Sequence, residues 1–415
     1  MAVRHAGIIA AALLSASCEN PPPQPAQANI VNDVTQLNPI AVERIATPRS
    51  IEDLSSLIAG HAGPISIGGG RFSQGGQTAC TGCLFIDMRG LNHVLSLDEK
   101  AHIITVQGGI TWREIQEAID PKDLSPKIMQ SFSNFTVGGA LSVNCHGDYV
   151  GLGPVVESVR SIKLVLADGS VVTASRDEHR DLFDAAIGGY GGIGVIAEAT
   201  LDLADNVRMD RVTIDTTVKD YPAWHEKNIV NGKDVILHHG VIYPPAYTHV
   251  AAETSTLTDK PVTVKDRLVP LAKPGSAFSL GALANVAAHI PFGAFIHERI
   301  YDPLTSSTHA VVWRNFEAAE DVYSLEPPSR AQSTYALEEY FVPVDRFEEF
   351  VPKMGAILNK HHANVLNVAI RHARADHEAL LAWAKADVYS FVLYYEQGTD
   401  EKAKAAVGEW TRALV

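Results

Sequence analysis

Three glycine-rich segments, each next to a β-branched run, constrain what this chain can fold into more than any other feature. They are residues 66–76 (SIGGGRFSQGG), 131–147 (SFSNFTVGGALSVNCHG) and 188–196 (GGYGGIGVI). Consecutive glycines let backbone N–H groups point into one concavity, which binds phosphate oxygens without a cationic side chain. The first segment lacks the Gly-Lys-Ser/Thr ending of a Walker loop and is not a GxGxxG fingerprint. Taken alone it is equally consistent with a flexible loop, but three such turns together predict an extended ligand, a dinucleotide threaded between two sheets.

The pattern of the chain changes near residue 205. Before that point, short β-branched runs alternate with helical stretches, and an Asp168-Gly169 pair marks a hairpin turn. Thr111 followed by Glu114 is typical of a helix N-cap with a capping box. The expected elements are strands at 65–67, 84–88, 103–106 and 195–203, a hairpin of 162–166 with 171–174, and a helix over 111–119.

After residue 205 the periodicity weakens, and residues 240–300 contain Pro-rich and Ala-rich segments. Further along, strands are expected at 336–342, 365–370 and 388–395, and amphipathic helices at 344–359, 376–386 and 399–414. The chain stops inside the last helical pattern without a Gly, Asn or Pro stop signal, so a truncated sequence is expected. The predicted fold class is α+β, with a ligand-binding domain over 35–205 and a substrate (cap) domain over 206–415.

Composition excludes several classes of protein. The 48 acidic residues outnumber the 34 Lys and Arg, and a net charge of −14 is unsuited to neutralising the phosphates of a nucleic acid. Four cysteines are too few for a disulfide scaffold in a chain of 415 residues. No apolar run reaches the roughly 20 residues needed to span a bilayer.

The first 28 residues have the order of an export signal. Arg4 precedes an apolar run over 6–14, which is followed by small residues up to Cys18. Two processing sites compete: lipoprotein cleavage before Cys18, with a lipid anchor on its thiol, and ordinary cleavage after Ala28. The segment therefore predicts a periplasmic protein or a membrane-anchored lipoprotein. The alternative is the unprocessed N-terminus of a cytoplasmic protein.

The order of five motifs resembles the vanillyl-alcohol-oxidase type of FAD-dependent oxidoreductase, with its two-part, PCMH-type FAD-binding domain. The motifs are GGGRFSQGG, FIDMRGLN, VQGGITW, TVGGALSVNCHG and GGYGGIGVI, between residues 68 and 196. Residues 144–147, 337–343 and 365–372 are similar to those of sugar-oxidising members, namely aldonolactone and alditol oxidases and decaprenylphosphoryl-ribose oxidase. The resemblance implies oxidation of a C–OH group of a sugar, polyol or aldonolactone, such as D-arabinono-1,4-lactone, by hydride transfer to flavin N5. The rival is an exported protein that binds FAD or a sugar without turnover.

The resemblance also implies which residues bind FAD. The first cluster would hold the pyrophosphate, and later residues would line the flavin, the ribityl chain and the adenine end. The implied residues are Ser66, Ile67, Gly68, Gly69, Gly70, Arg71, Phe72, Ser73, Gln74, Gly75, Gly76, Ser131, Thr136, Val137, Gly138, Gly139, Val143, Asn144, Cys145, His146 and Val195. Many relatives attach the flavin to a His in the first cluster, whereas Arg71 or Phe72 stands there in this chain. Non-covalent FAD is therefore expected.

Alcohol oxidation needs a base for the hydroxyl proton and groups that bind the substrate, and few residues are candidates. His146 ends the second glycine cluster, and its alternative role is a structural imidazole. Period-2 alternation places Glu339 on the opposite strand face from Glu338 and Tyr340, and its alternative role is a solvated edge charge. Arg371 and His372, at the end of the 365–370 strand, are further candidates. Arg371 could bind substrate hydroxyls or a phosphate, and the alternative role is a surface charge.

A Cys-x-x-Cys motif at residues 80–83 adds a separate question. A single pair of cysteines is a weak signal for zinc, because a zinc site needs further Cys or His ligands. Export would permit a local disulfide instead. No metal site is expected, and the sequence names no electron acceptor.

Overall fold

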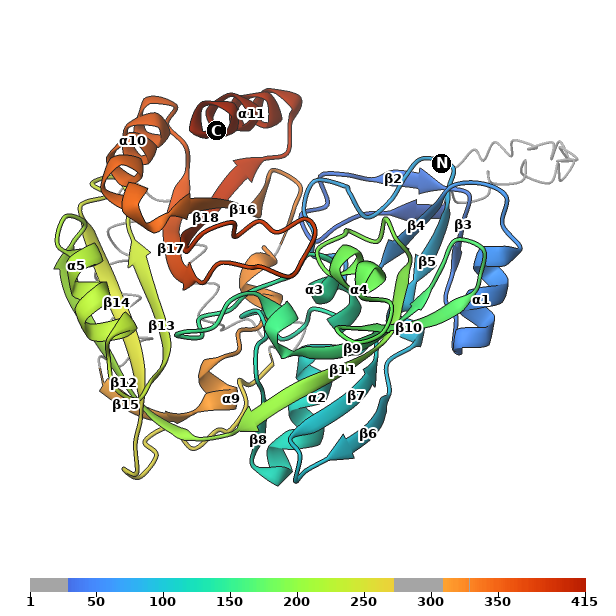
Figure 1. The fold of residues 1–415 in the computed structure, drawn as a ribbon. Helices are drawn as coiled ribbons and strands as arrows, with labels where there is room; N and C mark the ends of the chain where they lie inside the picture. Colours follow the sequence, from blue (N-terminus) through green and yellow to red (C-terminus); the bar gives the residue numbers. More distant parts are fainter. Residues whose placement is uncertain (1–28, 272–308, 328) are drawn as a thin grey trace, which may run out of the picture.

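The computed structural model describes residues 29–271, 309–327 and 329–415, and its chain forms two β-rich halves that meet along a broad interface (Figure 1). Residues 29–205 contain a three-stranded parallel sheet and a six-stranded antiparallel sheet, and residues 208–398 contribute a seven-stranded antiparallel sheet. The α+β class is therefore confirmed. The predicted export signal lies outside the described residues.

The small parallel sheet has the strand order β3-β5-β4 and carries the first glycine cluster at the end of β4. Helix α1 packs Leu54 and Ile58 against Leu84 and Ile86 of the central strand. The loop that leads into β5 contains a disulfide between Cys80 and Cys83. Of the two alternatives for this Cys-x-x-Cys motif, the structure therefore has the local disulfide and not a zinc site. The elements of this part are β1 (Asn29–Val31), β2 (Ile40–Val42), β3 (Arg44–Ala46), α1 (Ile51–Ala59), β4 (Ile65–Gly68), β5 (Leu84–Asp87) and η1 (Met88–Gly90).

The six-stranded sheet has the order β10-β9-β11-β7-β6, with β8 paired to β11. Its helix α2 begins as predicted, because Thr111 and Glu114 form both hydrogen bonds of a capping box. The predicted 162–174 hairpin is also confirmed, and Gly169 at its turn has a φ of +81°. The elements are β6 (Val94–Asp98), β7 (Ile103–Gln107), α2 (Trp112–Ile119), η2 (Asp120–Lys122), β8 (Leu124–Pro126), α3 (Val137–Ser142), η3 (Val155–Ser158), β9 (Val159–Val165), β10 (Val171–Ser175), α4 (Arg180–Ala186) and β11 (Val195–Asp205).

The seven-stranded sheet has the order β15-β12-β14-β13-β17-β18-β16, and its helices α5, α10 and α11 lie on the side away from the first half (Figure 1). Tyr221, Phe347, Met354 and Trp410 from these helices form one apolar core with the outer face of the sheet. The elements are β12 (Arg208–Thr217), α5 (Tyr221–His225), η4 (Glu226–Val230), β13 (Val235–Ile242), β14 (His249–Leu257), β15 (His309–Trp313), α9 (Arg314–Glu317), η6 (Val322–Leu325), β16 (Ser333–Pro343), η7 (Val344–Arg346), α10 (Phe347–Lys360), β17 (Val365–Ala373), β18 (Val388–Gly398) and α11 (Glu401–Leu414).

One expectation for this half is wrong. Residues 376–386 form a loop and not a helix, because the Asp376 carboxylate accepts hydrogen bonds from the N–H groups of Glu378 and Ala379 and fixes a turn. Residues 249–257 form a regular strand, β14, although the sequence there shows only weak periodicity. The remainder of the Ala-rich stretch, residues 272–308, lies outside the described part of the chain. Within the described part, no helix is long and apolar enough to cross a bilayer.

Candidate active site

A groove between the two sheets of the first half is built from the three glycine clusters. Its walls come from the first cluster, from helix α3 and the residue after it, and from the turn that precedes β11. The predicted residues that line it are Ile67, Gly68, Gly69, Gly70, Arg71, Phe72, Ser73, Thr136, Gly138, Gly139, Val143 and Val195. Gly108, Gln130, Tyr190, Gly191 and Gly194 also line it and were not among the predicted residues.

The groove is suited to a pyrophosphate-linked dinucleotide such as FAD. A Cβ at Gly69 would overlap the Thr136 side chain, so the first glycine cluster can pack this closely against Thr136 only because no side chain is present. Gly138 packs as closely, because its N–H donates to Gly108 O at 2.7 Å and a Cβ would lie 2.9 Å from that oxygen. The lining that the structure describes contains Arg71 and no carboxylate, which favours an anionic ligand.

Other residues of the predicted FAD set lie outside this groove lining, and several of them hold the surrounding structure together. Val137 and Cys145 belong to the buried apolar core, and burial raises the pKa of the Cys145 thiol. The N–H groups of Gly75 and Gly76 donate to the Asp33 carboxylate. The remaining residues of this kind are Ser66, beside Cys83; Gln74, which accepts from Leu337 N; Ser131, bonded to Arg371; Asn144, bonded to Asp376; and His146, bonded to Glu339.

A loop over residues 146–151 projects from the first half into the seven-stranded sheet. Tyr149 pairs with Leu237 of β13, Asp148 O accepts from His238 N at 2.8 Å, and Val150 N donates to Ile236 O at 3.1 Å. Strand β17 pairs with β13 only further along, at residues 240–242. The loop therefore occupies the place of a neighbouring strand and carries His146 and Asp148 to the inner face of that sheet.

His146 and Glu339 meet across the interface between the two halves. His146 Nε2 lies 2.7 Å from Glu339 Oε1, and the Ser390 hydroxyl donates to the same oxygen. Trp383 and Phe341 flank the imidazole, with ring centroids 5.1 and 6.0 Å away. The imidazole is almost fully buried, whereas 35% of the Glu339 side chain is exposed, so a ligand reaches Glu339 first.

The predicted alternation along β16 is confirmed by these contacts. Glu338 accepts hydrogen bonds from the hydroxyls of Tyr340, Tyr395 and Thr411 on the helix-covered side of the sheet. Glu339 points to the opposite side, toward His146. It is therefore not a solvated charge on a free sheet edge.

Arg371 joins the same cluster from strand β17. Its Nε lies 2.5 Å from Asp148 Oδ1, and its Nη2 donates to Ser131 Oγ at 3.0 Å. Asp148 also faces His239, at 3.5 Å from Nδ1 to Oδ2. Because 15% or less of each side chain of the Arg371–Asp148 pair is exposed, this ion pair belongs to the interior and not to the surface.

The charges of the cluster stabilise one another. Burial alone would raise the pKa of Glu339, but the charge and hydrogen bond of His146, with Ser390 and Arg371, lower it to about 2. Burial opposes the charged form of Asp148 as well, yet Arg371 and His239 keep its pKa below the usual value. Burial would lower the pKa of Arg371, whereas Asp148, Glu320 and Glu339 raise it.

The charged cluster adjoins the groove at two points of the chain. Gln130 lines the groove, and the next residue, Ser131, hydrogen-bonds to Arg371. Val143 lines the groove, and three residues later His146 contacts Glu339. The three predicted catalytic residues are therefore brought together beside the predicted cofactor groove.

The sequence did not single out several members of this cluster. Asp148 lies two residues after the candidate His146, but no hydrophobic periodicity in this loop indicates that its side chain would be buried. Ser390, Trp383 and His239 come from separate segments, and only the pairing of β13, β17 and β18 brings them near His146 and Arg371.

Comparison with known proteins agrees with this geometry. A family model described as "FAD binding domain" matches residues 42–175, which contain the first two glycine clusters. The chain thus carries an FAD-binding domain of PCMH type, and its cofactor is FAD.

Several of the proteins to which this chain is similar are named aldonolactone oxidases or dehydrogenases. A putative D-arabinono-1,4-lactone oxidase of Neurospora crassa is 26% identical over 200 residues, or 48% of this chain and 35% of the relative. L-galactono-1,4-lactone dehydrogenase 1, mitochondrial, of Oryza sativa subsp. japonica is 32% identical over 147 residues, or 34% of this chain and 25% of the relative. L-gulonolactone oxidase of Mus musculus is 29% identical over 154 residues, or 37% of this chain and 34% of the relative. The match to each of these three spans about a third of the relative's length or less.

Proposed function

We propose that this protein is an FAD-dependent oxidoreductase that oxidises a C–OH group of an aldonolactone, sugar or polyol. The observation that carries the proposal is the contact of His146 with Glu339, next to Arg371 and beside a groove suited to FAD. The named relatives support the aldonolactone class, and D-arabinono-1,4-lactone is the first substrate to test.

The residues of the cluster have separate tasks in such a reaction. FAD, when bound, supplies the acceptor for the hydride that leaves the carbinol carbon. Glu339 is the exposed member of its pair, so it accepts the hydrogen bond of the substrate hydroxyl. His146 and Glu339 are coupled through the contact of Nε2 with Oε1. When the imidazole is neutral, the proton that Glu339 accepts from the hydroxyl passes to Nε2, so the pair takes up the hydroxyl proton as one unit.

Arg371 is the cation of the site and binds substrate oxygens. Its guanidinium is held at Nε by Asp148 and at Nη2 by Ser131, which leaves the remaining N–H groups to contact a lactone or hydroxyl oxygen. Trp383 and Phe341 cover the imidazole and restrict access of water to the proton-accepting pair.

The proposal is tested with the purified, flavin-loaded protein under anaerobic conditions. Addition of D-arabinono-1,4-lactone, or of another member of a lactone and polyol panel, is expected to bleach the oxidised flavin absorbance. Protein that holds FAD but stays yellow with every member of the panel would favour binding without turnover.

Because no His stands in the first glycine cluster, we expect the FAD to be bound non-covalently. Acid precipitation should then leave the FAD in the supernatant, and a yellow pellet would contradict non-covalent binding.

We also propose export, on the basis of Arg4, the apolar run and Cys18 in the first 28 residues. Mass spectrometry of the protein from its native host is expected to find a start at Cys18, with lipid, or just after Ala28. An intact Met1 or Ala2 start in the soluble cytoplasm would rule the proposal out.

A further inference from the structure

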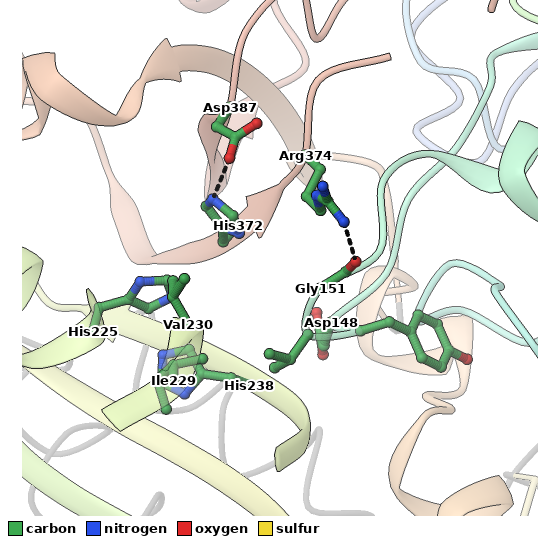
Figure 2. Close-up of a pocket in the computed structure, with 11 residues that line it drawn as sticks. Asp148, Gly151, His225, Ile229, Val230, His238, His372, Arg374 and Asp387 are labelled. Carbon is green, nitrogen blue, oxygen red and sulfur yellow. Dashed lines mark hydrogen bonds and ion pairs between the residues drawn. The ribbon is translucent and has the colours of Figure 1, made fainter. Parts of the chain in front are cut away.

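A second cavity lies between α5, the seven-stranded sheet and the 146–151 loop, and it is distinct from the FAD groove. Its volume is about 310 Å³, within the lower range of small-molecule sites. Figure 2 shows His225, His238, Ile229 and Val230 on one side, with His372, Asp387 and Arg374 above them. Residues 148–151 close the remaining side.

The cavity exists because two strands of the sheet separate there. Strands β13 and β17 pair at residues 240–242 and 368–370, and His238 and His372 lie just beyond this pairing. The 146–151 loop continues the hydrogen bonding of β13 in place of β17. The space between the loop and His372 is thus a consequence of how the two halves of the protein join.

Three imidazoles in the cavity are held in the neutral form. Burial lowers the pKa of His225 to about 3, and burial likewise lowers the pKa of His238 and of His372. A neutral imidazole offers one donor and one acceptor. The ring of His225 is central, because its centroid lies 5.2 Å from that of His238 and 5.3 Å from that of His372.

One ring nitrogen of His225 is buried without a hydrogen-bond partner in the described part of the chain. The residue is 2% exposed, and among the residues that the structure describes its Nε2 has no hydrogen-bond partner. His238, in contrast, is satisfied at both ring nitrogens by the Tyr221 hydroxyl and the Thr254 hydroxyl, each at 3.0 Å. A buried polar atom without a partner costs free energy, which a polar group held in the cavity would recover.

The charges around the cavity narrow the class of ligand. The charged side chains that line the cavity are Arg374, Asp387 and Asp148, and Asp148 is already paired with Arg371. The remaining two have opposite charges, so an anion and a cation would each meet one repelling group (Figure 2). Ile229 and Val230 add an apolar wall. In the described part of the chain no group of His, Cys, Asp or Glu is placed to hold a metal ion, and both nitrogens of His238 are already bonded.

We propose that this cavity is a second ligand site, which binds a small, uncharged, polyhydroxylated molecule of monosaccharide size. Hydroxyl groups would pair with His225 Nε2, with His372 and with the Arg374 and Asp387 side chains, and the C–H face would lie against Ile229 and Val230. The proposal goes beyond the oxidation reaction and does not depend on a catalytic role for His146.

The test uses a matched pair of variants at Val230, which lines the cavity and is 47% exposed. Val230→Trp is expected to fill the entrance, and Val230→Ala to leave it open. Xylitol is titrated calorimetrically into the flavin-loaded full chain, and crystals are soaked in the same compound. One binding event should be present in the wild type and in Val230→Ala and absent in Val230→Trp, with xylitol located beside His225.

Two further measurements separate this site from the oxidation site. His225→Phe should weaken the same event by about tenfold, the loss expected for one buried hydrogen bond. His249→Phe, at an exposed histidine of β14, should not change it. Xylitol-induced changes in the flavin spectrum report on the groove and should be the same in Val230→Trp and wild type. An unchanged binding event in Val230→Trp, ordered water alone in the cavity, or inorganic phosphate bound in preference to xylitol would overturn the proposal.

Discussion

His146 Nε2 and Glu339 Oε1 lie 2.7 Å apart although the two residues are separated by 193 positions in the chain. One residue follows a glycine-rich helix of the FAD-binding half, and the other lies on a strand of the seven-stranded sheet. The contact therefore couples the half that contains the FAD-binding domain to the sheet that carries the proposed substrate-binding groups.

Replacing His146 with Ala is expected to slow substrate-dependent flavin reduction by about 10²–10⁴-fold, the usual range for a positioned acid–base group. FAD should remain bound, because His146 is not part of the groove lining. The folded state should lose roughly 1–3 kcal/mol, as for one buried group left without its partner. Rapid-mixing absorbance and thermal melting measure the two effects. His93→Ala, at an exposed histidine of the same half, should change neither, and normal reduction rates in flavin-loaded His146→Ala would remove His146 from the reaction.

Replacing Asp148 with Asn should raise KM more than it lowers kcat, because Arg371 keeps its charge but loses the carboxylate that holds Nε. Breaking one partner of a buried ion pair costs about 3–5 kcal/mol, and the loss should be smaller here because Glu320 and Glu339 also face Arg371. Steady-state kinetics and urea unfolding provide the measurements. The matched control is Glu401→Gln, which breaks an exposed pair with Lys404 and should cost under about 1 kcal/mol. Equal KM values for Asp148→Asn and wild type would argue against the positioning role.

Replacing Gly69 with Ala should weaken FAD binding by about tenfold or more, equivalent to 1.4 kcal/mol or more. The new Cβ would overlap the Thr136 side chain, and both residues line the groove, so the wall must shift. Flavin absorbance of the purified protein and titration with FAD give the affinity. Gly408→Ala, in the middle of helix α11, is the control and should leave the flavin content unchanged. The assignment of the groove fails if both variants purify with the same amount of FAD.

A pH-dependent loss of stability is expected from Glu317. Burial, with the nearby Glu253 carboxylate, raises the pKa of Glu317 from 4.5 to about 8, although Arg211 Nη1 lies 3.1 Å away. The folded chain therefore holds this proton more tightly than the unfolded chain. The stabilisation is complete below pH 4.5 and is lost as the pH rises through about 8.

Glu317→Gln removes this titration. Between pH 4.5 and pH 8, the free energy of unfolding of the wild type should fall by about 1–3 kcal/mol more than that of the variant. Urea unfolding of both proteins at the two pH values measures the change. Glu401→Gln, at a side chain that is 90% exposed, should retain the wild-type pH dependence. Parallel pH profiles for Glu317→Gln and wild type would contradict the raised pKa.

The local elements of this chain could be predicted well because their signals are local. The capping box of Thr111 and Glu114 sits at the start of α2, and Asp168-Gly169 turns the β9–β10 hairpin, since each involves hydrogen bonds or backbone angles within a few residues. The failure at 376–386 has a local and a distant cause. The local cause is the Asp376 carboxylate, which accepts a backbone hydrogen bond and fixes a turn. The distant cause is Trp383, whose ring stacks on Phe341 and donates to Asn144 O instead of packing on one face of a helix.

The sequence by itself predicted much of the lining of the groove, because backbone that must approach another group closely requires glycine, and runs of glycine are visible in the chain. It also placed Glu339 on the correct face of β16, because alternation along a strand is a local property. Only the tertiary structure decided which charges meet. Asp148 pairs with Arg371, and His146 with Glu339, because a loop of one half replaces a strand of the other. A buried charge can be assigned a role only when the partner that offsets its desolvation is known.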